Sequence, residues 1–207
     1  MRAFAWWTVL LVACTSSAPA EPTSMRDRLT EETHLFVTAA ASAGAVTARL
    51  RTASGWDDAL IVLQLASGEL VTQAAPGGAI ALTAAQLELQ TIEIPATLTG
   101  HAAELTRPRL VLTAPASAAA TWSGDDSAEL DVALALQLSW SLAVDGIGVQ
   151  VGAPALPPLP AQLVLTGDGA HVAAELRIHA PGELWGWADR IALSDLELVL
   201  GAGTPSP

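Results

Sequence analysis

The sequence contains no lysine, no asparagine and no tyrosine, and its one cysteine, Cys14, lies near the start of the chain. These absences exclude a Schiff-base lysine, the lysine of a phosphate-binding P-loop and an asparagine-linked glycan. Outside position 14 the chain has no thiol nucleophile, no partner for a disulfide and no cysteine metal ligand. Composition alone therefore excludes several classes of enzyme and of disulfide-stabilised domain.

Positively charged residues are also scarce. The chain has 9 basic residues, all arginine, against 21 acidic ones, which gives a formal net charge of −12. Such a surface repels phosphate backbones and anionic headgroups, so we expect no nucleic-acid partner. Hydrophobic residues make up 51 % of the chain and charged residues 14 %, which is typical of a folded protein rather than a disordered one.

Common catalytic motifs are missing from the sequence. It contains no Gly-x-Ser-x-Gly, no His-Glu-x-x-His, no Ser-x-x-Lys and no glycine-rich phosphate loop. A pair of carboxylates could still catalyse glycoside hydrolysis, but with 21 acidic residues the presence of two carries no information. We therefore expect a protein that is not an enzyme and that needs no cofactor.

The N-terminus has the layout of a secretory signal peptide. Arg2 provides a positive start, residues 3–12 form an apolar run, and the small residue Ala13 follows. This run is roughly half of the ~20 residues that a membrane-spanning helix needs. The stretch Leu11-Val12-Ala13-Cys14 resembles the lipobox of bacterial lipoproteins.

The resemblance implies a specific modification of Cys14. In that family the cysteine thiol receives a diacylglycerol, a peptidase cuts before the cysteine (here between Ala13 and Cys14), and the new amine is usually acylated. Two acyl chains already give stable membrane anchoring. Thr15 in place of an aspartate favours the outer membrane. A cut after Ala18-Pro19-Ala20, giving a free protein that begins at Glu21, is the alternative.

These features predict the domain organisation. Residues 1–13 form the signal peptide, and residues 14–24 form a lipidated cysteine with a flexible tether that is small, polar and proline-bearing. Residues 25–201 form a single β domain, and residues 202–207 form a disordered tail. The predicted location is the cell envelope, at the outer membrane, facing the periplasm or the cell surface.

The longest predicted strand covers Leu130–Val144. Every second residue in it is apolar, which excludes a helix because a period of 3.6 would mix the two sets. At ~3.3 Å per residue such a strand would be about 50 Å long, so we expect it to be bent or shared between two sheets. Asp145-Gly146 predicts a turn after it.

Other segments repeat the alternation between turns rich in Gly, Pro, Ser and Asp. The apolar parity changes between Leu89 and Ile92, and again between Leu193 and Leu196, which predicts two β-bulges and a strongly curved sheet. Leu163 and Leu165 are expected to form a hairpin with the strand that starts at Val172.

One short helix is predicted before these strands. Ser24 with Asp27 three residues later is an N-cap pattern, and Met25 and Leu29 share a helical face. The predicted class is thus all-β: an antiparallel curved sheet, as a β-sandwich or a partly open barrel, with one N-terminal helix. A transmembrane barrel also fits the alternation, but the chain lacks the aromatic girdles of that class.

Few residues outside the N-terminus are candidates for a binding site. Trp185 and Trp187 point the same way in an extended chain and could contact a ligand or an interface, or could close one end of the core. The cluster of Asp125, Asp126, Glu129 and Asp131 could bind calcium or could be a charged turn. His171 and His179 are roughly 26 Å apart on one strand, so they cannot share a metal ion.

Two hypotheses follow for the β domain. The first is a membrane-anchored envelope lipoprotein that binds or scaffolds another envelope component. The alternative is a carrier that holds a lipid or another hydrophobic ligand in the cavity of its curved sheet. The membrane, through the anchor, and a lipid or an envelope protein are the expected partners.

Overall fold

The computed structural model describes residues 22–52, 55–94, 96, 100–150, 153–187 and 191–205. Most of the described chain is β-strand, so the predicted all-β class is confirmed. The elements are α1 (Met25–Arg28), β1 (Thr33–Val37), η1 (Ala39–Ala41), β2 (Ala43–Thr52), β3 (Gly55–Leu63), β4 (Leu65–Ala75), η2 (Pro76–Gly78), β5 (Ala79–Leu89), β6 (Ile92–Ile94), β7 (Ala103–Leu112), β8 (Ala116–Ala119), β9 (Thr121–Trp122), β10 (Ser127–Leu134), β11 (Leu136–Val144), β12 (Ile147–Gln150), β13 (Leu159–Gly167), β14 (Val172–Trp187) and β15 (Ile191–Gly203).

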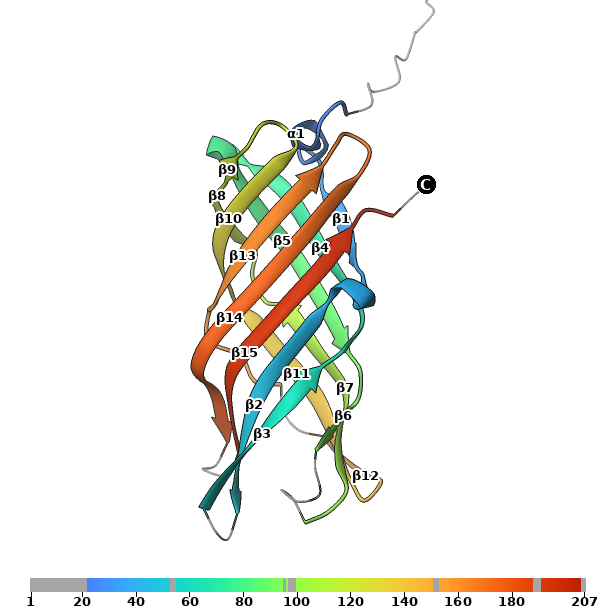
Figure 1. Cartoon of the computed structure of the whole chain (residues 1–207), viewed down its shortest axis with the longest axis vertical. Coiled ribbons are helices and arrows are strands. Elements are labelled where there is room, and N and C mark those ends of the chain that lie inside the picture. Colours follow the sequence, from blue (N-terminus) through green and yellow to red (C-terminus); the bar gives the residue numbers. More distant parts are fainter. Residues whose placement is uncertain are drawn as a thin grey trace, which may run out of the picture.

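The strands form one antiparallel sheet that is open rather than closed into a barrel. Its main path runs β12-β11-β7-β5-β4-β1-β15-β14-β13-β10-β9, with β2 and β3 added beside β15, β6 beside β7 and β8 beside β5. The sheet curls over, so that β2, β13, β14 and β15 form one layer and β4, β5, β7 and β11 face them in a second layer (Figure 1). The apolar side of each strand points into the space between the layers.

The long predicted strand Leu130–Val144 passes from one layer to the other. It is divided at Ala135 into β10, which pairs with β13, and β11, which pairs with β7. The carbonyl oxygen of Ala135 accepts hydrogen bonds from the Thr113 backbone N–H at 2.9 Å and from the Thr113 hydroxyl at 3.0 Å. The prediction that this strand is bent or shared is confirmed.

The predicted N-terminal helix is also present, as the single turn α1. The Ser24 side chain accepts a hydrogen bond from the Asp27 backbone N–H at 3.2 Å, which is the predicted N-cap. Met25 and Leu29 are fully buried. A helix this short is marginal alone, so its packing on the sheet holds it in place.

One of the two predicted bulges takes the expected form. In β15 the pairing with β2 shifts register between Ser194 and Glu197, and Asp195 between them has a left-handed φ of 54°. At the other position the chain is interrupted instead. Strand β5 ends at Leu89 and β6 begins at Ile92, because the intervening Gln90 donates its N–H to the Gln64 carbonyl rather than to a strand partner.

The predicted turns are present, and the C-terminal boundary is corrected. Asp145 and Gly146 have φ of 49° and 79°, which suits a tight hairpin between β11 and β12. The hairpin of β13 and β14 pairs Leu163 with Leu176 as expected. The tail predicted to begin at residue 202 is still strand to Gly203, because Ala202 is buried against the core and β14 pairs with it.

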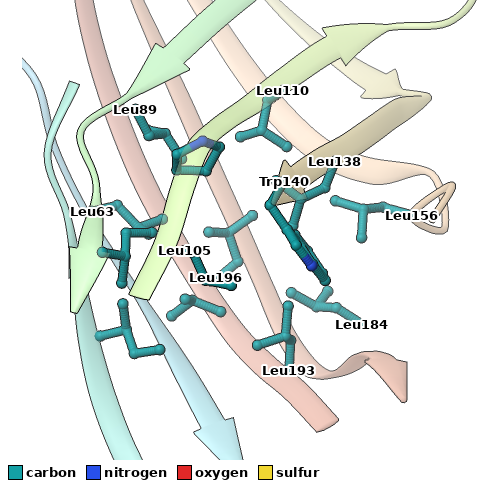
Figure 2. Close-up of a pocket in the computed structure, with 14 residues that line it drawn as sticks. Leu63, Leu89, Leu105, Leu110, Leu138, Trp140, Leu156, Leu184, Leu193 and Leu196 are labelled. Carbon is teal, nitrogen blue, oxygen red and sulfur yellow. The ribbon is translucent and has the colours of Figure 1, made fainter. Parts of the chain in front are cut away.

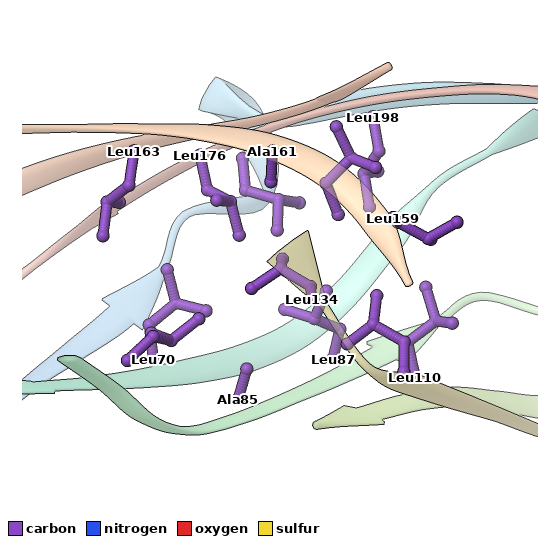
Figure 3. Close-up of a cluster of buried hydrophobic side chains, with 14 of the residues drawn as sticks. Leu70, Ala85, Leu87, Leu110, Leu134, Leu159, Ala161, Leu163, Leu176 and Leu198 are labelled. Atoms are coloured by element: carbon purple, nitrogen blue, oxygen red, sulfur yellow. The ribbon is translucent and has the colours of Figure 1, made fainter. Parts of the chain in front are cut away.

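The two ends of the molecule differ in how they are covered. The end that carries α1, called the closed end below, places Met25 and Leu29 over the space between the layers. The other end, called the open end, carries the β2–β3 and β11–β12 hairpins (Figure 1). A core of mostly leucine side chains extends between the ends, with Leu163 and Leu176 facing Leu70 across the layers (Figure 3).

Candidate functional site

An apolar cavity lies between the two layers toward the open end (Figure 2). One layer contributes side chains from β2, β3, β14 and β15, and the facing layer contributes them from β5, β6, β7 and β11, with one more from the segment before β13. The lining residues are Val46, Ile61, Leu63, Leu89, Ile92, Leu105, Pro108, Leu110, Leu138, Trp140, Leu156, Leu184, Leu193 and Leu196. All fourteen are apolar, so the cavity favours hydrocarbon over water.

The space between the lining atoms is about 560 Å³, part of it open to solvent, and about 60 Å³ can hold the centre of a water molecule. One water needs about 10–15 Å³ of such free space, so the cavity has room for a few water molecules. The cavity therefore exceeds an ordinary packing defect. Binding of a long acyl chain would require the leucine side chains of the two layers to move apart.

Irregular strand pairing surrounds this cavity. Register shifts occur in β14 between Ala180 and Trp185, in β15 after Ser194, and in β11 between Ser139 and Ser141. Arg107 in β7 has a left-handed φ of 51°. Bulges bend strands and redirect side chains, and they are frequent beside functional sites. Here they curve both layers at the level of the cavity.

Of the two predicted aromatic residues, Trp185 lies beside a residue that lines the cavity. Trp185 is half-buried and packs edge-on against Trp140, with ring centroids 5.2 Å apart and planes at 76°. Trp140 itself lines the cavity, so the Trp185 ring supports a lining residue from behind. For Trp187 the structure describes only the backbone, which pairs with Ile191. A ligand role for Trp185 and Trp187 stays a prediction.

Ala13 and Cys14 lie outside the described residues, so their predicted cleavage and lipidation also stay predictions. The described chain begins at Pro22, whose carbonyl oxygen lies against Gly169 in the β13–β14 turn at the closed end. The N-terminal segment therefore approaches the β domain at the end opposite the cavity.

The acidic cluster near residue 125 is used to attach α1. Asp125 accepts the backbone N–H of Arg26 through its carbonyl and lies 3.5 Å from the Arg26 guanidinium. The Asp126 carboxylate accepts the Met25 backbone N–H at 3.4 Å. Glu129 accepts a hydrogen bond from Gln162 at 2.7 Å. No group of three or more candidate metal ligands occurs within the described part of the chain.

Each of the four histidines faces a different carboxylate on the exposed surface. His34 pairs with Glu69 and His101 with Asp145, at 2.6 Å and 2.9 Å. His171 and His179 are closest to Asp168 and Glu197 respectively. His171, in the turn before β14, and His179, in β14, therefore face different carboxylates and do not converge, as predicted from their spacing.

Two exposed aspartates have lowered pKa values for structural reasons. At the β15 bulge, the Gly182 backbone N–H and then the Ser194 hydroxyl donate to Asp195 and hold the pKa of its carboxyl below the ordinary value. In the β13–β14 turn, the backbone N–H groups of His171 and Ala170 lower the pKa of Asp168 in the same way. The Asp195 carboxylate stabilises a bulge and the Asp168 carboxylate a turn, and neither lines the cavity.

Comparison with protein-family models, with curated proteins and with solved structures gives no match to this chain. Within the described residues, no helix has the length and apolar character needed to cross a bilayer. The cavity is the feature of the described structure that points to a function.

The residues that line the cavity were not predicted as a site. Their apolar parity marked them as core, like the equivalent residues of the closed end. The two parity changes, near residues 90 and 195, were the one sequence signal that pointed to this level of the molecule.

Proposed function

We propose that this chain is a lipid-anchored envelope protein whose β domain binds a hydrophobic ligand, of the acyl-chain class, in the cavity near the open end. The observation that carries the proposal is the cavity lining, which consists of apolar side chains from both layers. Burying hydrocarbon there is favourable by about 25 cal/mol per Å² of apolar surface removed from water. The lining contains no charged or polar side chain that would hold water in the cavity.

The anchor part of the proposal rests on the sequence Leu11-Val12-Ala13-Cys14. Attachment through Cys14 would place the closed end nearest the membrane, since Pro22 lies at that end. The cavity would then face away from the anchoring bilayer, where it could take up or deliver a ligand.

Photo-crosslinking tests ligand binding. The full chain in phosphatidylcholine vesicles is exposed to a long-chain alcohol that carries a diazirine on its alkyl chain, and labelled peptides are mapped by mass spectrometry. We expect labels on lining residues such as Leu138, Leu184 and Leu193. Filling the cavity with Leu138→Phe and Leu193→Phe should abolish this labelling.

Ile147→Phe is the matched control, because this side chain is 72 % exposed at the tip of the β11–β12 turn. It adds similar bulk without entering the cavity and should leave the labelling unchanged. Labelling that is spread over the exposed surface, or that persists in the filled variant, would overturn the carrier proposal.

The anchor has a separate test. The mass of the mature N-terminal peptide should correspond to a chain that begins at Cys14 and carries acyl groups, and Cys14→Ser should remove both the modification and the membrane fractionation. An unmodified chain that begins at Glu21 would refute the anchor and support the alternative cut after Ala20.

A second candidate function, the scaffolding of another envelope component, is favoured by strand β3. This strand pairs with β2 alone in the described structure, and its outward Leu60 and Val62 are 71 % and 62 % exposed. An unprotected edge of this kind can accept a strand from a partner. Leu60→Glu should abolish capture of such a partner.

A further inference from the structure

A groove follows the seam between β3 and β6, on the outside of the cavity wall. Strand β3 pairs with β2 and β6 pairs with β7, and no strand pairing joins β3 to β6 within the described residues. The Gln90 backbone N–H donates to the Gln64 carbonyl at 2.8 Å where the seam begins. The residues that line the groove are Leu60, Ile61, Val62, Gln64, Gln90, Thr91, Ile92 and Glu93.

Ile61 and Ile92 belong to both the groove and the cavity. Each is 8 % exposed, whereas the other residues that line the groove are exposed. These two side chains are therefore the partition between an outer groove and an inner apolar space. Moving them requires rotamer changes, and no backbone pairing between β3 and β6 has to break.

We infer that a single-chain amphiphile enters the cavity sideways through this seam, with its hydrocarbon chain between Ile61 and Ile92 and its headgroup in the groove. This inference rests on the proposed binding of a hydrophobic ligand in the cavity. It adds the route of entry and the chemical class of the headgroup.

The groove selects the headgroup by its polar residues. Gln64, Gln90 and Thr91 supply amides and a hydroxyl, which both donate and accept hydrogen bonds. Glu93 supplies one negative charge, and no arginine or histidine lines the groove. A sulfate, phosphate or carboxylate would lie beside Glu93 without a cation, in a chain of net charge −12. The ligand class is therefore an acyl chain with an uncharged, hydroxyl-bearing headgroup, such as a monoacylglycerol.

Two positional isomers of one probe test the route. A monoacylglycerol is prepared with a diazirine either at the end of its acyl chain or on its glycerol, and the full chain is labelled in phosphatidylcholine vesicles. We expect the chain-end probe to label Leu138, Leu184 or Leu193 in the cavity. The glycerol probe should label residues 60–64 and 90–93 in the groove.

The outcomes separate the route from the proposed function. Failure of the chain-end probe to label the cavity would overturn the proposed function and this inference together. Labelling of the cavity by the chain-end probe, with the glycerol probe labelling the Asp145-Gly146 turn instead of the groove, would leave the proposed function intact and overturn the lateral route.

Headgroup selection has its own variant and control. A long-chain alkyl sulfate should compete for the cavity about tenfold less well than the monoacylglycerol, which corresponds to about 1.4 kcal/mol. Thr91→Arg places a cation in the groove and should remove this difference. Gln86→Arg adds the same charge on the exposed outer face of β5 and should leave it unchanged. Equal competition by the sulfate in the unmodified chain would overturn the headgroup assignment.

Discussion

The closed and open ends of this domain use the same aliphatic side chains but pack them differently. At the closed end Leu35, Leu70, Leu163 and Leu165 are fully buried, and α1 lies over them. At the open end Leu105, Leu138, Leu184 and Leu193 remain partly exposed around a cavity. The contrast shows that one continuous core can supply stability at one end and free volume at the other.

The backbone explains the difference. Near the closed end the β10–β13 and β13–β14 pairs keep constant register, so opposing side chains interdigitate, and the shift between Val71 and Thr72 affects only the β4–β5 pair. Near the open end β11, β14 and β15 all shift register, and β5 gives way to β6. Irregular strands on both sides cannot bring their apolar faces into full contact, and space remains between them.

The largest expected effect comes from truncating one leucine at each end. Leu70→Ala should lower the free energy of unfolding by about 2–5 kcal/mol, because the side chain is fully buried and a new void forms. Leu138→Ala should cost only about 1 kcal/mol, since this side chain already borders free space. Urea denaturation of both variants measures the difference. Equal losses would show that the two ends are packed alike.

The next effect concerns two glycines. A Cβ at Gly169 would lie 1.9 Å from the Pro22 carbonyl oxygen, so Gly169→Ala must push the N-terminal segment away from the closed end. We expect a loss of about 1–3 kcal/mol. Gly148→Ala in β12 is the control, because no atom lies within 4 Å of its added Cβ, and it should change stability by less than about 0.5 kcal/mol. A neutral Gly169→Ala would mean that this contact does not hold the segment.

A smaller effect should come from two neighbouring threonines at the closed end. The Thr72 hydroxyl is fully buried without a hydrogen-bond partner, so Thr72→Val should stabilise the protein by about 1 kcal/mol. The Thr33 hydroxyl, opposite it in β1, donates to the carbonyls of Arg28 and Glu31. Thr33→Val should therefore destabilise the protein by a similar amount. Thermal unfolding of the two variants tests whether each substitution stabilises or destabilises the protein. Destabilisation by both would indicate that the Thr72 hydroxyl has a hydrogen-bond partner.

The smallest effect is a pH dependence of the two exposed aspartates. Their folded-state pKa values are lowered, so each contributes stability above the unfolded-state pKa of about 3.9 and loses it as the pH falls through the folded value. Asp195→Asn and Asp168→Asn should each be less stable than the parent near neutral pH and equal to it in strong acid. Denaturant titrations from neutral pH to strong acid measure the difference in stability between each variant and the parent. A constant deficit at all pH values would exclude ionisation as the cause.

Much of the fold could be predicted from the sequence, because alternation of apolar residues reports directly which face of a strand is buried. The Ser24 cap, the division of the long strand and the bulge near Asp195 all follow from local patterns. The break at Gln90 was predicted as a bulge, because both change the parity and only the hydrogen bond from Gln90 to Gln64 distinguishes them. The continuation of the last strand through Ala202 was not predicted, because the small residues Gly201, Ala202 and Gly203 show no clear alternation of apolar and polar side chains.

The candidate site was beyond the same reasoning. Leu70 and Leu138 occupy equivalent places in an alternating pattern, yet one is sealed and the other lines a cavity. Ile61 and Ile92 both line the cavity and the groove, but they belong to strands that no local signal connects. Trp185 could be placed on a strand but not against Trp140.

The sequence by itself determined the all-β class, the position of the turns, the acidic surface and the prediction of an anchor at Cys14. These depend on residue type and spacing, which a one-dimensional pattern contains. Only the tertiary structure decided where the layers meet closely and where they leave a cavity. That outcome depends on the register and curvature of strands distant in the chain, and these fix how far apart two apolar faces lie.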